Sequence, residues 1–221
     1  MPDTLFTGPA GRLEGRYSPG RSPIAPIALV LHAHPQYGGT MNTKLVYSLF
    51  NSFAQRDFAT LRFNFRGVGR SQGSYDGGEG ELSDAAAALD WLQTANPNAR
   101  SVWVAGFSFG AWIAMQLLMR RPEIDGFVSV APPAGRLDFN FLTPCPASGL
   151  IVQGGRDDIA EETSTAALVQ KLSRQKEVMI DYQVIPEAGH FFSDHFQDME
   201  SAVGGYLDRV LRMPTALAAS A

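Results

Sequence analysis

Residues 102–115 read VWVAGFSFGAWIAM and place a serine between two apolar segments of different character. The first four residues are β-prone and predict a strand, whereas the last five predict a helix, so Ser108 falls on a sharp turn between them. On such a turn the serine backbone is strained and its hydroxyl is exposed above the sheet. A β-carbon at Gly106 or Gly110 would collide as strand and helix close on each other. The pattern therefore predicts a nucleophilic Ser108, and the plainer alternative is a helix-capping serine between two loop glycines.

Strand and helix patterns alternate on both sides of this turn. A β-hairpin is predicted within residues 5–17. Apolar runs predict strands at residues 27–31, 59–65, 101–105, 127–131, 150–153 and 178–185, and periodic patterns predict helices at 43–56, 82–92, 108–119, 166–172 and 195–211. This alternation favours the α/β class, with a mostly parallel sheet and helices on both faces. The Ala-rich residues 213–221 are expected to fray.

Length and composition narrow the possible classes of protein. The 221 residues allow one domain or two, and the candidate site residues spread from Gln36 to His190 favour one domain over residues 1–221. A net charge of −4 gives no reason to expect a nucleic-acid partner. The single cysteine, Cys145, excludes an internal disulfide and a cysteine zinc site. The absence of a signal-like start and of long apolar runs predicts a cytoplasmic protein without a membrane partner.

A histidine that follows Ser108 in the chain is the expected base. A serine on such a turn usually takes an acid and then a histidine from later in the sequence, which sets His32 and His34 aside. His190 lies just beyond the last predicted strand, where open α/β sheets assemble their sites. His195 is better explained as a surface residue of the terminal helix. We therefore predict that His190 is the base.

The acid is expected after the predicted strand 150–153. Asp157 and Asp158 both follow that strand closely. The chemistry needs a buried carboxylate that accepts a hydrogen bond from the histidine ring and fixes its tautomer. Asp157 is the preferred candidate and Asp158 the alternative; the other aspartate would be a turn or helix-capping residue.

Two backbone N–H groups are expected to stabilise an oxyanion. The N–H of Phe109 begins the helix after the serine and should point at the oxyanion. The second should come from the loop after strand 27–31, where Gln36 and Tyr37 are the candidates because Pro35 has no N–H. His32 and His34 in the same loop could form a metal pair, but no third ligand is evident nearby, and hydrogen bonds that orient the loop are the better explanation.

Four segments carry a family resemblance that covers residues 27–211. They are HPQYGG (34–39), FNFRGVGRS (63–71), GFSFG (106–110) and GHFF (189–192). With them the chain resembles the α/β hydrolases, in particular small lidless bacterial serine hydrolases and esterases related to dienelactone hydrolases. The resemblance implies Ser108 as nucleophile, His190 as base, Asp157 as acid and a structural role near the site for residues 63–71. Two departures stand out: dienelactone hydrolases use a cysteine nucleophile, and a histidine–glycine turn common in the family is replaced by HPQY.

The connection between the strands 127–131 and 150–153 is too short and too rich in proline for a helical lid. An open site is therefore expected, with a substrate-binding wall built from aromatic side chains, namely Tyr37, Phe107, Phe109, Phe191 and Phe192. Core packing is the plainer explanation for some of them.

The sequence thus predicts a serine hydrolase that cleaves carboxylic acyl esters through an acyl-enzyme and needs no cofactor or metal. Cleavage of amides or peptides, acyl transfer, and a non-catalytic binding scaffold are the alternatives. The expected partner is a small acyl ester, and an exposed edge strand or apolar site leaves a homodimer open.

Overall fold

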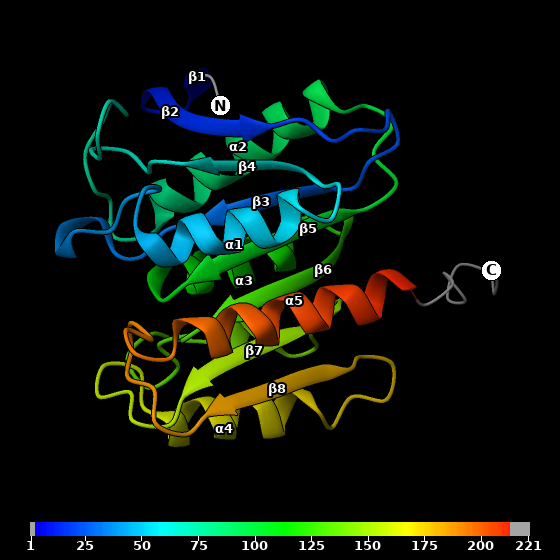
Figure 1. Cartoon of the computed structure of the whole chain (residues 1–221). Helices are drawn as coiled ribbons and strands as arrows, with labels where there is room; N and C mark the ends of the chain where they lie inside the picture. Colours follow the sequence, from blue (N-terminus) through cyan, green and yellow to red (C-terminus); the bar gives the residue numbers. More distant parts are fainter. Residues whose placement is uncertain (1–2, 213–221) are drawn as a thin grey trace.

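Residues 3–212, which a computed structural model describes, contain eight strands that form one sheet (Figure 1). In chain order the strands are β1 (Asp3–Gly8), β2 (Gly11–Ser18), β3 (Ile27–Leu31), β4 (Ala59–Phe63), β5 (Val102–Phe107), β6 (Ile124–Val130), β7 (Ser148–Gly154) and β8 (Ile180–Ile185). Their order in the sheet is β1-β2-β4-β3-β5-β6-β7-β8. The β1–β2 hairpin joins β4 in antiparallel fashion, and all other neighbours are parallel. The predicted α/β class and N-terminal hairpin are confirmed, whereas the tail predicted at 213–221 lies outside the described residues.

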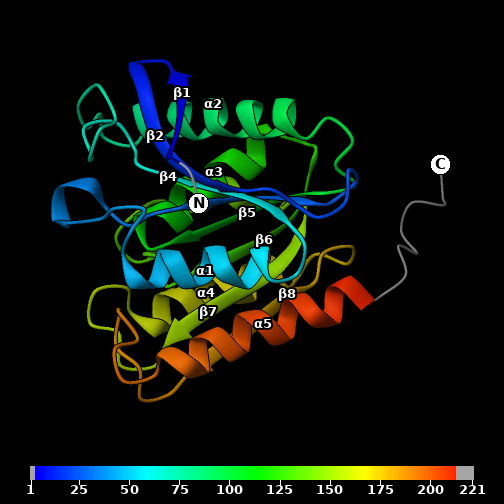
Figure 2. The same ribbon diagram turned by 45° about the horizontal axis from the view of Figure 1, so that its top comes forward.

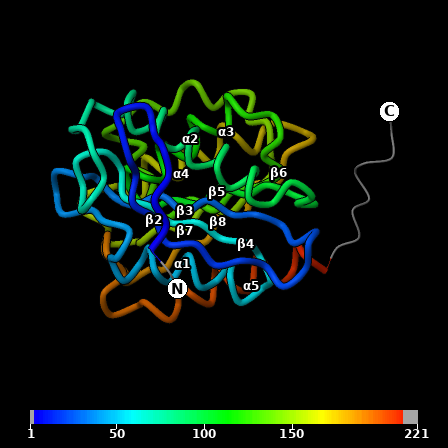
Figure 3. The backbone as a smooth tube through the Cα atoms, turned by 90° about the horizontal axis from the view of Figure 1, so that it is seen from above, coloured from blue at the N-terminus to red at the C-terminus, as the bar shows by residue number. Residues whose placement is uncertain are grey.

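Helices cover both faces of this sheet, as the alternation predicts. They are α1 (Lys44–Ala54), α2 (Glu79–Ala95), α3 (Phe109–Arg120), α4 (Glu162–Leu172) and α5 (Phe196–Arg212). Helices α1 and α5 lie on one face and α2, α3 and α4 on the other, and the view in Figure 3 shows the three layers. Figure 2 shows α2 and α3 on the side of the sheet away from α1 and α5. The layers make two cores, one on each side of the central strands. Strand β3 is buried at all five positions, which explains why it is an unbroken apolar run.

Strand β4 ends two residues earlier than its alternating pattern predicts. Phe65 turns out of the ladder because its backbone N–H donates to Nε2 of His32, at 3.0 Å, instead of to a neighbouring strand. The backbone N–H of Asn64, one residue earlier, still donates to the carbonyl of Glu14 on the neighbouring strand β2, at 2.8 Å. The chain therefore leaves the sheet beside β3 and enters the glycine-rich loop that precedes α2.

The connection from β6 to β7 forms no helical lid. Within this connection, which lies wholly in the described part of the chain, the helical structure is limited to the 3-10 turn Asn140–Leu142. The structure thus agrees with the absence of a cap inferred from the prolines. Among residues 3–212, no helix has both the length and the apolar character that crossing a membrane requires.

Candidate active site

Ser108 occupies a strained turn between β5 and α3. Its backbone has φ 55° and ψ −118°, a conformation that costs a residue with a β-carbon about 1–3 kcal/mol. The turn is held in place because the Ser108 N–H donates to the carbonyl of Val130 at 2.9 Å. A β-carbon on Gly106 would overlap the carbonyl of Gly110, as the sequence predicts. A β-carbon on Gly110 would instead meet the backbone at the end of β3, so this glycine lets the turn pack against a third strand.

The ends of three parallel strands bring Ser108, His190 and Asp157 together. Ser108 follows β5, Asp157 follows β7 and His190 follows β8, and these strands run in the same direction, toward one edge of the sheet (Figure 1). Nε2 of His190 lies 3.0 Å from Oγ of Ser108, and Nδ1 of His190 lies 2.8 Å from Oδ2 of Asp157. All three side chains are largely buried, so the two hydrogen bonds are shielded from water.

Asp157, not Asp158, is the carboxylate that contacts the histidine. Asp157 is buried, whereas Asp158 is exposed. Burial acts to raise the pKa of Asp157, but hydrogen bonds from His190 and from the N–H groups of Ala160 and Ile159 outweigh it and hold this pKa below its usual value. Asp157 is thus kept as an anion that can orient the imidazole.

Gln153 supports this carboxylate, a role that the sequence patterns above do not predict. Its side-chain nitrogen donates to Oδ2 of Asp157 at 3.1 Å and to the carbonyl of Ala160 at 2.7 Å. Its side-chain oxygen accepts from the hydroxyl of Thr165. The sequence did contain a signal for this role, because Gln153 is a polar residue at the end of an apolar strand. A fully buried amide needs hydrogen-bond partners, which indicates polar groups nearby.

The backbone N–H groups of Gln36 and Tyr37, in the loop after β3, donate hydrogen bonds within the loop, contrary to the prediction that one of them contacts an oxyanion. The N–H of Gln36 donates to Nδ1 of His34 at 3.2 Å, and the N–H of Tyr37 donates to the carbonyl of His34 at 3.1 Å. Both are therefore taken up inside a 3-10 turn (Pro35–Tyr37), which speaks against Gln36 and Tyr37 as oxyanion donors. Within the described residues no acceptor lies on the N–H of Phe109, which begins α3, or on that of His34. The His34 and Phe109 rings are neighbours, 4.9 Å apart between centroids.

His32 locks this loop to the neighbouring one. Its Nε2 accepts from the N–H of Phe65, so its Nδ1 carries the proton that is donated to the carbonyl of Ala33 at 2.6 Å. The ring is fully buried, and burial lowers the pKa of His32 to about 4. The two histidines therefore orient the loop through hydrogen bonds, with His32 neutral near neutral pH.

This burial predicts a pH-dependent stability. An unfolded histidine has a pKa near 6.5, so the unfolded chain takes up a proton that folded His32 refuses. The contribution of neutral His32 to the free energy of unfolding is therefore present in full above about pH 6.5. It is lost as the pH drops toward about 4, by a total of about 3 kcal/mol. Denaturant unfolding at a series of pH values measures this. The variant His32→Gln should show a shallower slope in that window, and an unchanged slope would refute the assignment.

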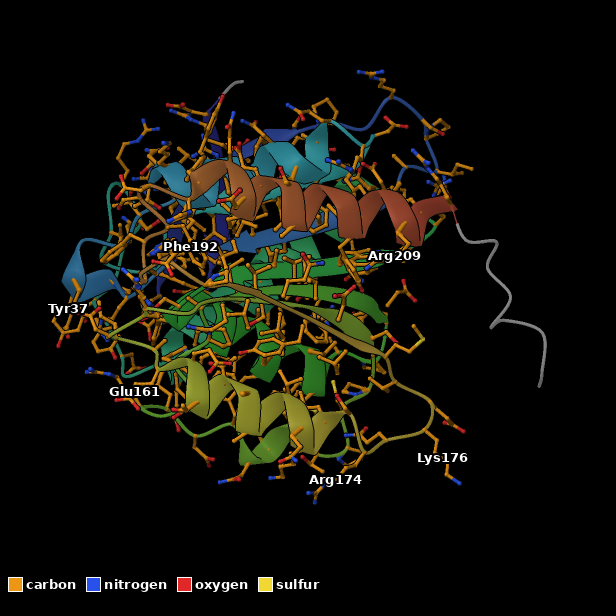
Figure 4. The ribbon with its side chains drawn as sticks, turned by 60° about the horizontal axis from the view of Figure 1, so that its bottom comes forward. Tyr37, Glu161, Arg174, Lys176, Phe192 and Arg209 are labelled. Atoms are coloured by element: carbon orange, nitrogen blue, oxygen red, sulfur yellow. The ribbon has the colours of Figure 1, made fainter. Side chains whose placement is uncertain are left out.

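The predicted aromatic wall divides into exposed and buried members. Tyr37 is 85% exposed and Phe191 is 60% exposed, whereas Phe107 and Phe109 are buried. Phe192 does not line the site, because its side chain is fully buried in the core beneath α5. Figure 4 shows Tyr37 at the edge of the molecule. Phe192 has φ 52°, so the turn after His190 sends it inward while Phe191 stays outside. Phe107, Tyr37 and Phe191 line a pocket of about 310 Å³.

Residues 63–71 hold the neighbouring loop. Arg66 donates from its backbone N–H, Nε and Nη2 to the buried carboxylate of Asp84, and Ser71 Oγ donates to the carbonyl of Asn64 at 2.6 Å. The Phe65 ring packs edge-on against Phe109, with 6.0 Å between ring centroids. The segment therefore supports the residue that follows Ser108.

Comparison with known proteins agrees with this architecture. A family described as the alpha/beta hydrolase fold matches residues 29–149. A protein of unknown function from Agrobacterium tumefaciens has 57% sequence identity to this chain. Its crystal structure superimposes with a TM-score of 0.93, covering 95% of this chain and 96% of that one. An alpha-beta serine hydrolase homologue from Coxiella burnetii is 34% identical (TM-score 0.84, 93% and 97% covered). A serine hydrolase without a lid from Xanthomonas campestris is 29% identical (TM-score 0.83, 96% of both chains).

Proposed function

Since this chain belongs to the α/β hydrolase family, we propose that it is a serine hydrolase that cleaves carboxylic acyl esters. The observation that carries the proposal is the continuous hydrogen-bonded chain from Ser108 Oγ through His190 to Asp157. A nucleophile, a base and an orienting acid in this order are the parts that acyl transfer through serine needs. The likeness to a serine hydrolase homologue from Coxiella burnetii and to a serine hydrolase from Xanthomonas campestris supports the same chemistry.

In the first half of the proposed reaction, Ser108 Oγ attacks the ester carbonyl while Nε2 of His190 takes its proton. Asp157 accepts from Nδ1–H of His190, which keeps Nε2 unprotonated and ready, and it stabilises the imidazolium that forms. The imidazolium then returns the proton to the departing alcohol, and the acyl group stays on Ser108. In the second half, His190 takes a proton from a water that attacks the acyl-enzyme, and the imidazolium returns this proton to Ser108 Oγ as its bond to the acyl group breaks and the carboxylic acid leaves.

Two backbone N–H groups, those of Phe109 and His34, are the proposed oxyanion donors. Phe109 follows Ser108 in the chain, and the ring of His34 packs against the ring of Phe109. Neither N–H has an acceptor among residues 3–212, so both are free to donate to an oxyanion. Removing one such donor in serine hydrolysis typically costs about 10²–10³ in rate.

The pocket suits a small apolar group of an ester. The pocket of about 310 Å³ lies at the small end of the range of about 300–1,000 Å³ for small-molecule sites. It has room for one short apolar group of a substrate. A small acyl ester is therefore the proposed substrate class.

A fluorophosphonate probe tests the proposed nucleophile directly, because it forms a covalent bond only with an activated serine. We expect one adduct on the wild-type protein, at Ser108, and none on Ser108→Ala, as measured by intact mass and peptide mapping. A screen of short-chain esters, amides and lactones on the same two proteins then identifies the bond that is cleaved. A wild-type protein that takes no label would favour a binding scaffold.

A further inference from the structure

The pocket that includes Phe107, the residue before Ser108, is lined by one positively charged side chain. Its apolar walls come from Phe107, Phe191 and Phe196, with Leu45 at the start of α1. Of the residues that line it, all within the described range 3–212, Lys44 alone is positively charged and none is acidic. A small, mostly apolar pocket with one charge is suited to a ligand that is apolar along its length and ionic at one point.

This pocket adjoins the proposed catalytic residues. The rings of Phe107 and Phe191 each lie with their centroids 5.1 Å from that of His190, so both pack against the base. On the other side the pocket is bounded by Ala33, next to the proposed oxyanion donor His34. A substrate bound to Ser108 would therefore place one of its two arms in this pocket.

Lys44 is free to meet a ligand. It is the first residue of α1 and is exposed, and its Nζ lies 4.0 Å from the centroid of the Phe196 ring. In the described part of the chain it takes part in none of the salt bridges. Glu200 on α5 bonds to a different residue of α1: its carboxylate accepts from Oγ of Ser48, one turn beyond Lys44, at 2.6 Å. Within residues 3–212, the Lys44 ammonium thus lies over the face of an aromatic ring and forms no salt bridge.

We propose that the preferred substrates are esters whose apolar arm ends in a carboxylate, and that Lys44 binds this carboxylate. The inference rests on the proposed function and specifies its substrate class. Two kinds of ester share the required chemistry: monoesters of dicarboxylic acids, with the charge on the acyl arm, and esters of hydroxy acids, with the charge on the alcohol arm. An ammonium at the rim of an apolar pocket favours an anionic end and disfavours a cationic one.

Paired substrates of equal length isolate the charge. On the acyl side the pair is 4-nitrophenyl hydrogen adipate and 4-nitrophenyl hexanoate; on the alcohol side it is the acetate ester of 6-hydroxyhexanoic acid and hexyl acetate. The readout is the ratio of kcat/KM for the acidic ester to that for its neutral partner, so a general effect of a substitution cancels. The wild-type ratio should exceed one on one side, and that side identifies the arm that enters the pocket.

The variants test whether Lys44 sets this ratio. Lys44→Met should lower the ratio about 5-fold, the upper end for a solvent-accessible ion pair, whereas Lys44→Arg should retain most of it. Sodium chloride at about 1 M should lower the wild-type ratio, because the Debye length is then about 3 Å. Lys176→Met is the matched control: Lys176 is exposed and lies at the opposite end of the molecule from Tyr37 (Figure 4), so its ratio should stay that of the wild type.

The outcomes separate this inference from the function on which it rests. A wild-type protein that cleaves the neutral esters with a ratio that neither Lys44→Met nor salt changes would overturn the role of Lys44 alone. A wild-type protein that takes no fluorophosphonate and cleaves none of the four esters would overturn the proposed function as well. A ratio that falls equally in Lys44→Met and Lys176→Met would also count against the site, since it would reflect the net charge of the protein.

Discussion

Ser108→Ala should lower kcat for a short-chain 4-nitrophenyl ester by about 10⁶-fold, the scale on which loss of a catalytic serine acts in other serine hydrolases. The hydroxyl is the atom that the proposal places in covalent contact with substrate, and His190 Nε2 lies 3.0 Å from it, ready to remove its proton. Alanine keeps the β-carbon, so the backbone at φ 55° is as strained as before and the fold should be retained. Circular dichroism and the midpoint of thermal unfolding check this.

Turnover by a folded Ser108→Ala protein within about tenfold of the wild type would refute the mechanism. A small remaining rate would not, because the oxyanion donors and substrate binding alone accelerate such reactions by about 10³–10⁴ over water. Active-site titration of the wild-type preparation guards against contamination by another esterase.

Asp157→Asn should lower kcat by about 10⁴-fold, while the neighbouring Asp158→Asn should change it by less than about threefold. An asparagine amide can donate to Nδ1 of His190, which moves the imidazole proton to Nε2, and a protonated Nε2 cannot accept from Ser108. Asp158 is exposed, whereas Asp157 is buried against the ring. The two variants have the same change in charge and composition, so the comparison reports position alone.

Equal losses in the two aspartate variants would refute the assignment of the acid. The Asp157→Asn protein should remain folded, since its side-chain oxygen can still accept from the N–H groups of Ile159 and Ala160. Its unfolding free energy should be measured alongside kcat, because the buried carboxylate contributes to the loop as well as to the site.

Local sequence patterns were sufficient for the layered architecture and for the serine turn. A parallel strand buried on both faces must be a continuous apolar run, as β3 is, and a helix against such a sheet must repeat its apolar residues at helical spacing, as α1 does. The turn at Ser108 was equally predictable from the sequence. Gly106 and Gly110 are required there because the backbones of the strand and the helix approach too closely for a β-carbon. These constraints act between residues that are near in sequence, so a short stretch of sequence is enough to predict them.

The details of the site depended on contacts between distant segments. Ser108 and His190 are 82 positions apart and Asp157 and His190 are 33 apart, so the order of the motifs indicated partners but not contacts. Which of two adjacent aspartates faces the ring is set by the turn after β7, and a positive φ at Phe192 sends inward a side chain expected to line the site. The 3-10 turn after β3 occupies the N–H groups of Gln36 and Tyr37.

Lys44 shows the same division between sequence and structure. In the sequence Lys44 is an ordinary lysine at the start of an amphipathic helix. The helical pattern shows which face of the helix is buried, but not which residues lie beyond the end of the helix. Only the packing of α1 beside β5 and the loop that precedes α5 places it in a pocket with Phe107 and Phe196. Sequence periodicity records which side of each element is buried, whereas the direction of a single side chain in a loop or at a helix end is decided when the elements pack.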